Sequence, residues 1–253
     1  MTKTVELPKD YRLVTFERLD STNEEAKRRA QDGADTGLVL WAQSQSAGRG
    51  RRGRTWISPD GGLYFSILLR PNCSPAQAAQ LSFVSALAVG DGIAAELRNS
   101  GDLKFKWPND VLIEDRKIAG ILLESANGAK NLEWLVVGIG INVANHPDNM
   151  DYPATSLNAE SNSRPALEKV LGNVVRAFDN WMQIWLVEGF APIQTAWLER
   201  ARGLNQKIAV RLFDQTISGT FQGLAPDGAL RLEVPGEGER IIPAGDVYFP
   251  GHN

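Results

Sequence analysis

The feature that most constrains the fold is a change of hydrophobic pattern near Gly203-Leu204-Asn205. Before this point, residues 165–186 and 192–200 repeat apolar side chains with the period of a helix. After it, no stretch fits a helix, and short apolar runs alternate with Asp-Gly and Pro-Gly turns. We therefore predict two domains, residues 1–203 and 204–253, the second a small β-barrel with strands at 207–213, 217–224, 229–234 and 240–243.

The first domain combines helices and strands. Pro75 suits the first position of a helix, and the apolar, Ala-rich run after it predicts a core helix to about Leu97. Ser21-Thr22-Asn23-Glu24 has the form of a capping box that opens a shorter helix. Glu114-Asp115-Arg116 predicts a tight hairpin turn. The domain is therefore predicted to be α+β, with a mixed, largely antiparallel sheet of strands at 11–19, 38–43, 63–69, 104–107, 111–114, 117–124 and 134–143.

Charge and composition exclude several classes of protein. A net charge of −3 gives no overall positive field that would hold a polyanion. The single cysteine, Cys73, cannot form an intrachain disulfide, and two histidines provide no Cys/His zinc cluster. The chain has no apolar signal segment and no stretch of about 18 apolar residues. We expect a cytoplasmic protein that does not associate with membranes.

Four arginines alternate with glycines between Ala47 and Trp56, and no acidic residue occurs between Asp35 and Asp60. Guanidinium groups match phosphate oxygens, and the glycines let backbone amides approach an anion. The run predicts a phosphate-binding loop, although its composition alone fits a solvated basic loop or an arginine-rich nucleic-acid segment equally well. With no acid nearby, the arginines are expected to repel each other and to leave the loop mobile until a ligand binds.

A second motif, Lys106-Trp107-Pro108-Asn109-Asp110, places an ammonium, an amide and a carboxylate at the end of a predicted strand. Arg116-Lys117-Ile118-Ala119-Gly120 follows across the hairpin turn. Magnesium takes carboxylate and phosphate oxygens, and a lysine stabilises charge that develops on a phosphoryl group. These motifs indicate a site for a nucleotide with magnesium.

With Ser21-Thr22-Asn23, Gln45 and Gly138-Ile139-Gly140-Ile141-Asn142-Val143, the two motifs closely resemble, in order and spacing, the biotin protein ligase family. The resemblance extends from about Tyr11 to the C-terminus. It implies a catalytic domain like that of class II synthetases and biotinyl/lipoyl ligases, followed by an SH3-like barrel. It also implies an ATP-dependent ligase that activates biotin as biotinyl-5′-AMP and transfers it to a lysine. The implied acceptor is the biotin carboxyl carrier protein of acetyl-CoA carboxylase or of a related carboxylase.

The resemblance also assigns roles to individual residues. Lys117 and Arg51 are implied as catalytic groups, and Asp110 as the partner of Mg²⁺. Biotin contacts are implied at Ser21, Thr22, Asn23, Gln45, Gly48, Arg49, Gly50, Arg51, Lys117 and Gly120, and nucleotide contacts at Arg49, Arg51, Arg54, Trp56, Lys106, Asn109 and Asn142.

Family members that also repress transcription carry a helix-turn-helix domain before the first strand, whereas only ten residues precede Tyr11 here. We therefore expect a monofunctional ligase, monomeric or weakly dimeric, that binds no specific DNA. Two alternatives remain open. A lipoate or octanoate ligase or transferase would share the fold but lack this pair of motifs. A non-enzymatic RNA-binding module would use Arg49, Arg51, Arg52, Arg54 and the barrel.

Overall fold

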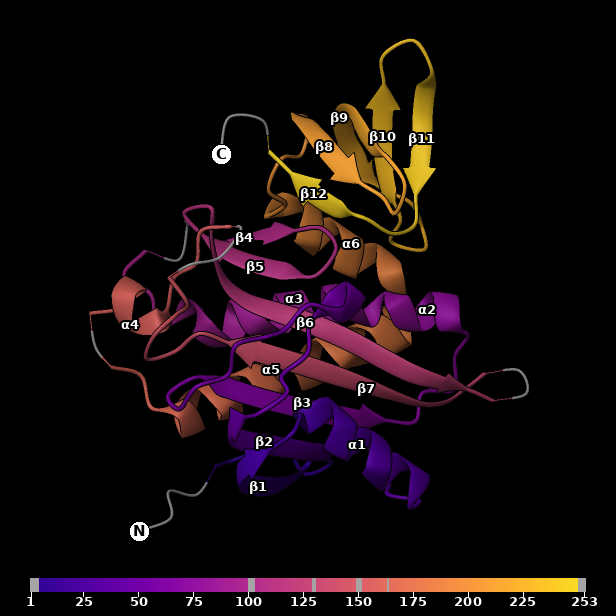
Figure 1. Cartoon of the computed structure of the whole chain (residues 1–253). Coiled ribbons are helices and arrows are strands. Elements are labelled where there is room, and N and C mark those ends of the chain that lie inside the picture. Colours follow the sequence, from indigo (N-terminus) through magenta and orange to yellow (C-terminus); the bar gives the residue numbers. More distant parts are fainter. Residues whose placement is uncertain (1–4, 100–102, 129–130, 149–151, 163, 250–253) are drawn as a thin grey trace.

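The structure is a computed structural model that describes residues 5–99, 103–128, 131–148, 152–162 and 164–249. It contains a main sheet with helices on both faces and a second sheet at one end (Figure 1). The strands of the main sheet are β1 Arg12–Leu19, β2 Leu38–Gln45, β3 Leu63–Leu69, β4 Leu103–Lys106, β5 Asp110–Ile113, β6 Arg116–Asn127 and β7 Leu132–Ile141, and the helices are α1 Thr22–Gln31, α2 Pro75–Ala79, α3 Leu81–Ala94, α4 Leu157–Glu160, α5 Leu167–Glu188 and α6 Phe190–Glu199.

The seven strands of the main sheet lie in the order β1-β2-β3-β7-β6-β5-β4. Only β1 and β2 pair in parallel, and every other neighbouring pair is antiparallel. The predicted mixed, largely antiparallel α+β fold is therefore confirmed. Glu114 and Asp115 both have positive φ angles, 47° and 63°, which form the predicted tight turn between β5 and β6.

Strand β2 separates two apolar layers because successive side chains point to opposite faces of a sheet. Leu38 and Leu40 join one buried cluster with Ala26 and Ala30 of α1. Val39 and Trp41 belong to the larger cluster, which contains the buried residues of α3, α5 and α6. Helix α1 therefore covers one face, and helices α3, α5 and α6 cover the opposite face (Figure 1).

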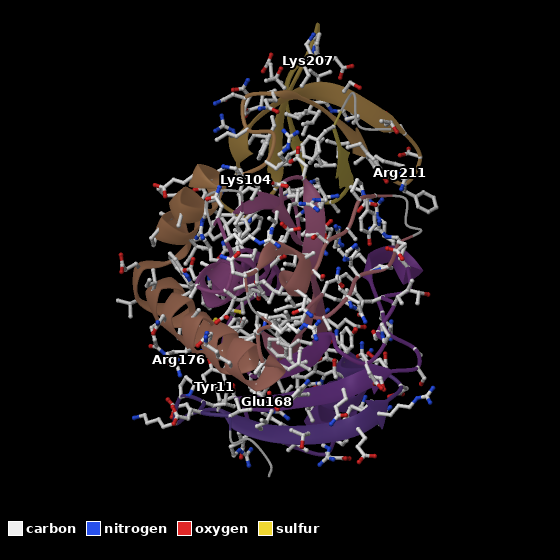
Figure 2. All side chains as sticks on the ribbon, turned by 90° about the vertical axis from the view of Figure 1, so that its left-hand side faces the viewer. Tyr11, Lys104, Glu168, Arg176, Lys207 and Arg211 are labelled. Atoms are coloured by element: carbon white, nitrogen blue, oxygen red, sulfur yellow. The ribbon has the colours of Figure 1, made fainter. Side chains whose placement is uncertain are left out.

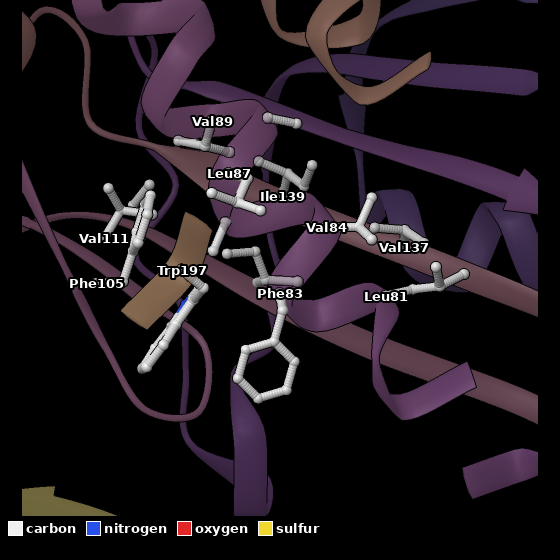
Figure 3. Packing of buried hydrophobic residues seen from close by; sticks show 14 of the residues in the cluster. Leu81, Phe83, Val84, Leu87, Val89, Phe105, Val111, Val137, Ile139 and Trp197 are labelled. Carbon is white, nitrogen blue, oxygen red and sulfur yellow. The ribbon is translucent and has the colours of Figure 1, made fainter. Parts of the chain in front are cut away.

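Helix α3 is buried on almost every side, since it lies between the sheet, α5 and α6. A Cβ atom at Gly92 would lie 2.7 Å from the Cα atom of Val174 in α5, so glycine allows this close helix contact. Phe83 packs edge-on against Phe190 and Trp197 of α6, with ring centroids 5.4 and 5.3 Å apart. Figure 3 shows Phe83 and Trp197 together within this core.

Two details of the predicted helices are wrong. Helix α1 begins at Thr22 as predicted, but the Ser21 side chain makes no capping hydrogen bond. Glu24 does not reach back to the helix start, because it pairs with Lys27 and Arg49. The long helix predicted at 75–97 is divided at Gln80 into α2 and α3. A capping box does occur at the start of α2, between Ser74 and Gln77.

The second sheet is antiparallel throughout, in the order β11-β10-β9-β8-β12. Its buried apolar residues, including Phe221 and Leu230, join the larger cluster of the main sheet. Trp107 also donates a hydrogen bond from Nε1 to the Gly228 carbonyl at 3.0 Å. The boundary after residue 203 stays a prediction. The strands are β8 Lys207–Arg211, β9 Thr216–Leu224, β10 Leu230–Val234, β11 Gly238–Ile242 and β12 Asp246–Tyr248, of which β12 was not predicted.

Figure 2 shows Lys207 and Arg211 on this C-terminal sheet at one end of the molecule, with Tyr11, Glu168 and Arg176 toward the other end. Within the residues that the structure describes, no helix is both long enough and apolar enough to cross a membrane.

Candidate active site

A cavity of about 240 Å³ lies between the start of α1, the Gly-Arg loop (residues 47–56) and strands β5 to β7. Of the predicted residues, Gly48, Lys106 and Asn142 do not line it. The cavity wall also contains Thr55, Ile121, Leu122, Gly138, Ile139, Gly140 and Tyr152, which were not predicted. The predicted residues that line it are Ser21, Thr22, Asn23, Gln45, Arg49, Gly50, Arg51, Arg54, Trp56, Asn109, Asp110, Lys117 and Gly120.

One end of the cavity is a polar cluster built around Gln45. The Gln45 Oε1 atom accepts hydrogen bonds from the backbone N–H of Thr22 at 2.8 Å and from its hydroxyl at 3.2 Å. The Gln45 Nε2 atom donates to the Ser58 hydroxyl at 2.8 Å. These bonds fix which end of the amide is the donor and which is the acceptor. The end of β2 is thereby tied to the first turn of α1.

Asn23 is held on both sides. Its Nδ2 donates to Glu124 Oε2 at 2.8 Å, and its Oδ1 lies 2.6 Å from the hydroxyl of Ser66, which also lies 2.8 Å from the Thr22 hydroxyl. A Cβ atom at Gly138 would lie 2.1 Å from Asn23 Oδ1, so glycine leaves room for this side chain. Sequence reasoning missed Ser66. The available signal was a serine in the otherwise apolar strand β3, where it is fully buried.

Replacing Ser66 with alanine is expected to lower the free energy of unfolding by roughly 1 kcal/mol, because the buried Asn23 and Thr22 oxygens lose a partner. It should also raise the KM for biotin, the substrate that the sequence resemblance implies, since both residues belong to the polar end of the cavity. Ser85→Ala is the matched control. Ser85 is equally buried but donates to the Leu81 carbonyl within α3, away from the cavity. Melting temperatures and biotin kinetics of the two variants check this, and an equal KM for both would contradict the role of Ser66.

Asp110 and Lys117 in the cavity wall form an ion triad with Lys106, which does not line the cavity. Asp110 Oδ1 lies 2.6 Å from Lys117 Nζ, and Asp110 Oδ2 lies 3.2 Å from Lys106 Nζ. Burial by itself would raise the pKa of Asp110, but the two ammonium groups hold it below the ordinary value. Asp110 therefore stays ionised and fixes both lysine side chains. The strand end and the hairpin predicted from the sequence do bring these residues together.

Two aromatic rings face Lys117. Its Nζ lies 5.2 Å from the ring of Trp56 and 5.0 Å from the ring of Tyr152, both within cation-π range. A smaller adjoining pocket shares Trp56, Tyr152 and Lys117 with the main cavity, and Asn142 lines it. The Asn142 amide donates to the Thr155 carbonyl at 3.0 Å, which ties β7 to the segment beside Lys117. Tyr152 was missed because the residues around it show no strand or helix pattern.

The arginines of the Gly-Arg loop pair with acidic residues that lie outside the loop. Asp246, at the start of β12, pairs with Arg54 at 2.9 Å and with Arg52 at 3.3 Å. Arg49 pairs with Glu24 and lies 3.4 Å from Glu124. The expectation that these arginines have no compensating acid is therefore wrong, because the acids come from distant parts of the chain. The expected mobility of the loop stays a prediction.

Arg51 is the most enclosed of the four arginines. Its Nη1 donates to Asn109 Oδ1 at 3.3 Å and to the Gly245 carbonyl at 3.2 Å, so it joins the main sheet to the second sheet. Burial lowers the pKa of the guanidinium from its ordinary value. Asn109 also donates from Nδ2 to the Ile121 carbonyl at 2.7 Å. Both ends of the Asn109 amide are thus occupied, which positions Arg51 at the cavity wall.

Each oxygen of Asp110 contacts an ammonium group, so lysines engage the carboxylate in this structure. The expected role of Asp110 as the magnesium partner stays a prediction. Across residues 5–249, apart from the short undescribed gaps, no three His, Cys, Asp or Glu side chains cluster as a metal site. The arrangement offers fixed cations to an anionic ligand instead.

Two parts of the chain match known protein families. Residues 15–142 match the Biotin/lipoate A/B protein ligase family, and residues 203–249 match the Biotin protein ligase C terminal domain. The chain is 41% identical to a Biotin--[acetyl-CoA-carboxylase] ligase of Paracoccus denitrificans, over 92% of this chain and 99% of the relative. It is 32% identical to the Bifunctional ligase/repressor BirA of Bacillus spizizenii, over 93% of this chain and 73% of the relative.

A solved structure shows the same fold. It is a biotin protein ligase from Aquifex aeolicus in complex with biotin and ATP, which superposes with a TM-score of 0.81 at 29% sequence identity. The match covers 93% of this chain and 97% of the other.

Proposed function

Since the chain belongs to the biotin protein ligase family, we propose that it activates biotin with ATP and attaches it to a carrier protein. The first half-reaction joins the biotin carboxylate to the α-phosphorus of ATP, giving biotinyl-5′-AMP and releasing pyrophosphate. In the second, the amine of a carrier lysine attacks the carbonyl carbon of this mixed anhydride and AMP leaves. Relatives and a solved structure with biotin and ATP support this assignment.

The observation that carries the proposal is the ion-paired Lys117 between a polar cluster and a cationic loop. We assign the biotin ureido group to the end of the cavity lined by Ser21, Thr22, Asn23 and Gln45. The biotin tail would then run along Gly120 and Gly140, where a Cβ atom would lie within 3.0 Å of the Trp56 ring. The carboxylate would reach Lys117.

Lys117 is the proposed catalytic residue. Asp110 holds its ammonium group at 2.6 Å, so no reorganisation is needed when negative charge grows on the α-phosphate. Asn142 and Tyr152 line the adjoining pocket and are proposed nucleotide contacts, with Trp56 between the two ligands. Lys106 is proposed to support the site through its pair with Asp110.

The Gly-Arg loop is proposed to cover the adenylate. Arg49, Arg51 and Arg54 line the cavity and supply guanidinium groups for the phosphate. Gly48 allows a tight turn here, because a Cβ atom would lie 2.3 Å from the Trp56 carbonyl. A covered anhydride is protected from water until the carrier lysine arrives.

Magnesium is proposed to enter with ATP and to be held by its phosphate oxygens and by water, where it would neutralise phosphate charge. The carrier is proposed to be the biotin carboxyl carrier protein of acetyl-CoA carboxylase or of a related carboxylase. The cytoplasmic location, the monomeric or weakly dimeric state and the lack of specific DNA binding stay predictions.

The test is ATP-dependent transfer of labelled biotin to a purified biotin carboxyl carrier domain. We expect one biotin per domain on its acceptor lysine, with pyrophosphate released. The same assay with lipoate or octanoate in place of biotin tests the alternative, a lipoate or octanoate ligase or transferase of the same fold. Mass spectrometry identifies the acyl group that is transferred. Transfer of lipoate or octanoate but not of biotin would overturn the proposal. The RNA-binding alternative is disfavoured because Asp246 neutralises part of the basic loop that it requires.

A further inference from the structure

One carboxylate of the second sheet, that of Asp246, contacts the Gly-Arg loop. The Asp246 side chain is only 12% exposed, and it is surrounded by the guanidinium groups of three arginines. Arg54 Nη2 lies 2.9 Å from Asp246 Oδ1, Arg52 Nη1 lies 3.3 Å from Oδ2, and Arg51 Nη1 lies 3.7 Å from Oδ1. The single negative charge of Asp246 is shared by three guanidinium groups. The loop therefore keeps a net positive charge that can bind an anionic ligand.

The strand pairing of the second sheet also sets the position of the Asp246 carboxylate. Asp246 opens β12 and is paired in register with Arg211 of β8. The residue before it, Gly245, packs so closely that a Cβ atom would lie 2.6 Å from Val210 Cγ1. Two backbone carbonyls complete the contact, because Arg51 donates to Gly245 at 3.2 Å and Arg52 donates to Arg211 at 3.4 Å. The anchor therefore belongs to a sheet and not to a flexible side chain on a loop.

On these contacts we propose that Asp246 is a positioning residue that anchors the Gly-Arg loop to the C-terminal sheet and thereby controls how long the enzyme retains its adenylate. The control of adenylate retention rests on the proposed function, whereas the anchoring of the loop by Asp246 does not. Asp246 touches no reacting atom. It acts through Arg52 and Arg54, which lie on either side of Gly53 in the loop.

The anchoring step is tested without any substrate. The four loop arginines are trypsin sites, and proteolysis reports how often a segment opens. Asp246→Asn keeps the size of the side chain and removes its charge. Cleavage after Arg51, Arg52 or Arg54 is expected to become faster by roughly tenfold, because charge-assisted hydrogen bonds to the loop are lost. Cleavage after Arg231 and Arg240, in the same sheet as Asp246, should not change, and this separates loop release from unfolding of the sheet.

Glu239→Gln is the matched control. It removes the same charge from the same sheet by breaking the pair between Glu239 and Arg231 at 2.7 Å, which does not involve the loop. If trypsin cleaved the loop of the Asp246→Asn enzyme no faster than that of the Glu239→Gln enzyme, the proposed anchoring by Asp246 would be wrong.

The functional step is tested with biotin, ATP and a non-carrier protein. The Asp246→Asn enzyme should form adenylate at a rate near that of the wild type but release it roughly tenfold faster, and so label the non-carrier protein. If the Asp246→Asn enzyme retained its adenylate as long as the Glu239→Gln enzyme does, the proposed role of Asp246 in adenylate retention would be wrong. If the wild type formed no adenylate, the proposed function would fail, whereas the trypsin result would stand by itself.

Discussion

Replacing Lys117 with alanine is expected to slow biotinyl-adenylate formation by about two to three orders of magnitude, the usual cost of removing one group that stabilises developing charge. The protein should stay folded. Lys117 is 12% exposed and its loss leaves Asp110 with a second cation, Lys106, at 3.2 Å. The buried carboxylate thus keeps a partner, and the large penalty of an unpaired buried charge is avoided.

Biotin- and ATP-dependent pyrophosphate release measures the first half-reaction. Lys106→Ala is the comparison, since it also removes one ammonium from Asp110 but leaves the pair between Lys117 and Asp110 intact. We expect a much smaller loss of rate in that variant and similar melting temperatures for both. Near-normal pyrophosphate release by Lys117→Ala would show that another group stabilises the transition state.

Replacing Arg51 with glycine is expected to make the adenylate leave the enzyme roughly 10- to 100-fold faster, while its formation is affected less. Arg51 holds the Gly-Arg loop to Asn109, directly before β5 of the main sheet, and to Gly245, directly before β12 of the second sheet. A hydrogen bond from a charged group contributes about 1.5–3 kcal/mol, which corresponds to this range of rates. Glycine also adds backbone freedom to a loop that already contains Gly48, Gly50 and Gly53.

Escape of the adenylate has a visible product, because a free mixed anhydride acylates exposed lysines without selection. The Arg51→Gly enzyme is incubated with biotin, ATP and a non-carrier protein, and labelling is compared with that by the wild type. We expect strong labelling only by the variant. Equal and negligible labelling by both enzymes, with adenylate still formed, would mean that the loop does not retain the intermediate.

Most of the elements could be predicted because hydrophobic periodicity is a local property of the sequence. The strands predicted at 11–19, 38–43 and 63–69 correspond to β1, β2 and β3, and the helical pattern at 165–186 corresponds to α5. The short α4 and β12 were missed, since elements of four and three residues carry too few periods to recognise. The capping box was assigned to Ser21 instead of Ser74 because a four-residue motif does not reveal which tertiary contacts compete for its side chains.

The sequence by itself determined the α+β fold, the family and most residues of the cavity wall, because the motifs that supply them are contiguous in the chain. Only the tertiary structure decided which charges and hydrogen bonds complete the site. Ser66 meets Asn23 across 43 residues, and Asp246 meets Arg54 across 192. Such pairs depend on strand order, register and the packing of one sheet on another. Nothing local in the chain specifies them, since an ion pair requires only that two opposite charges be brought within a few ångströms by the rest of the fold.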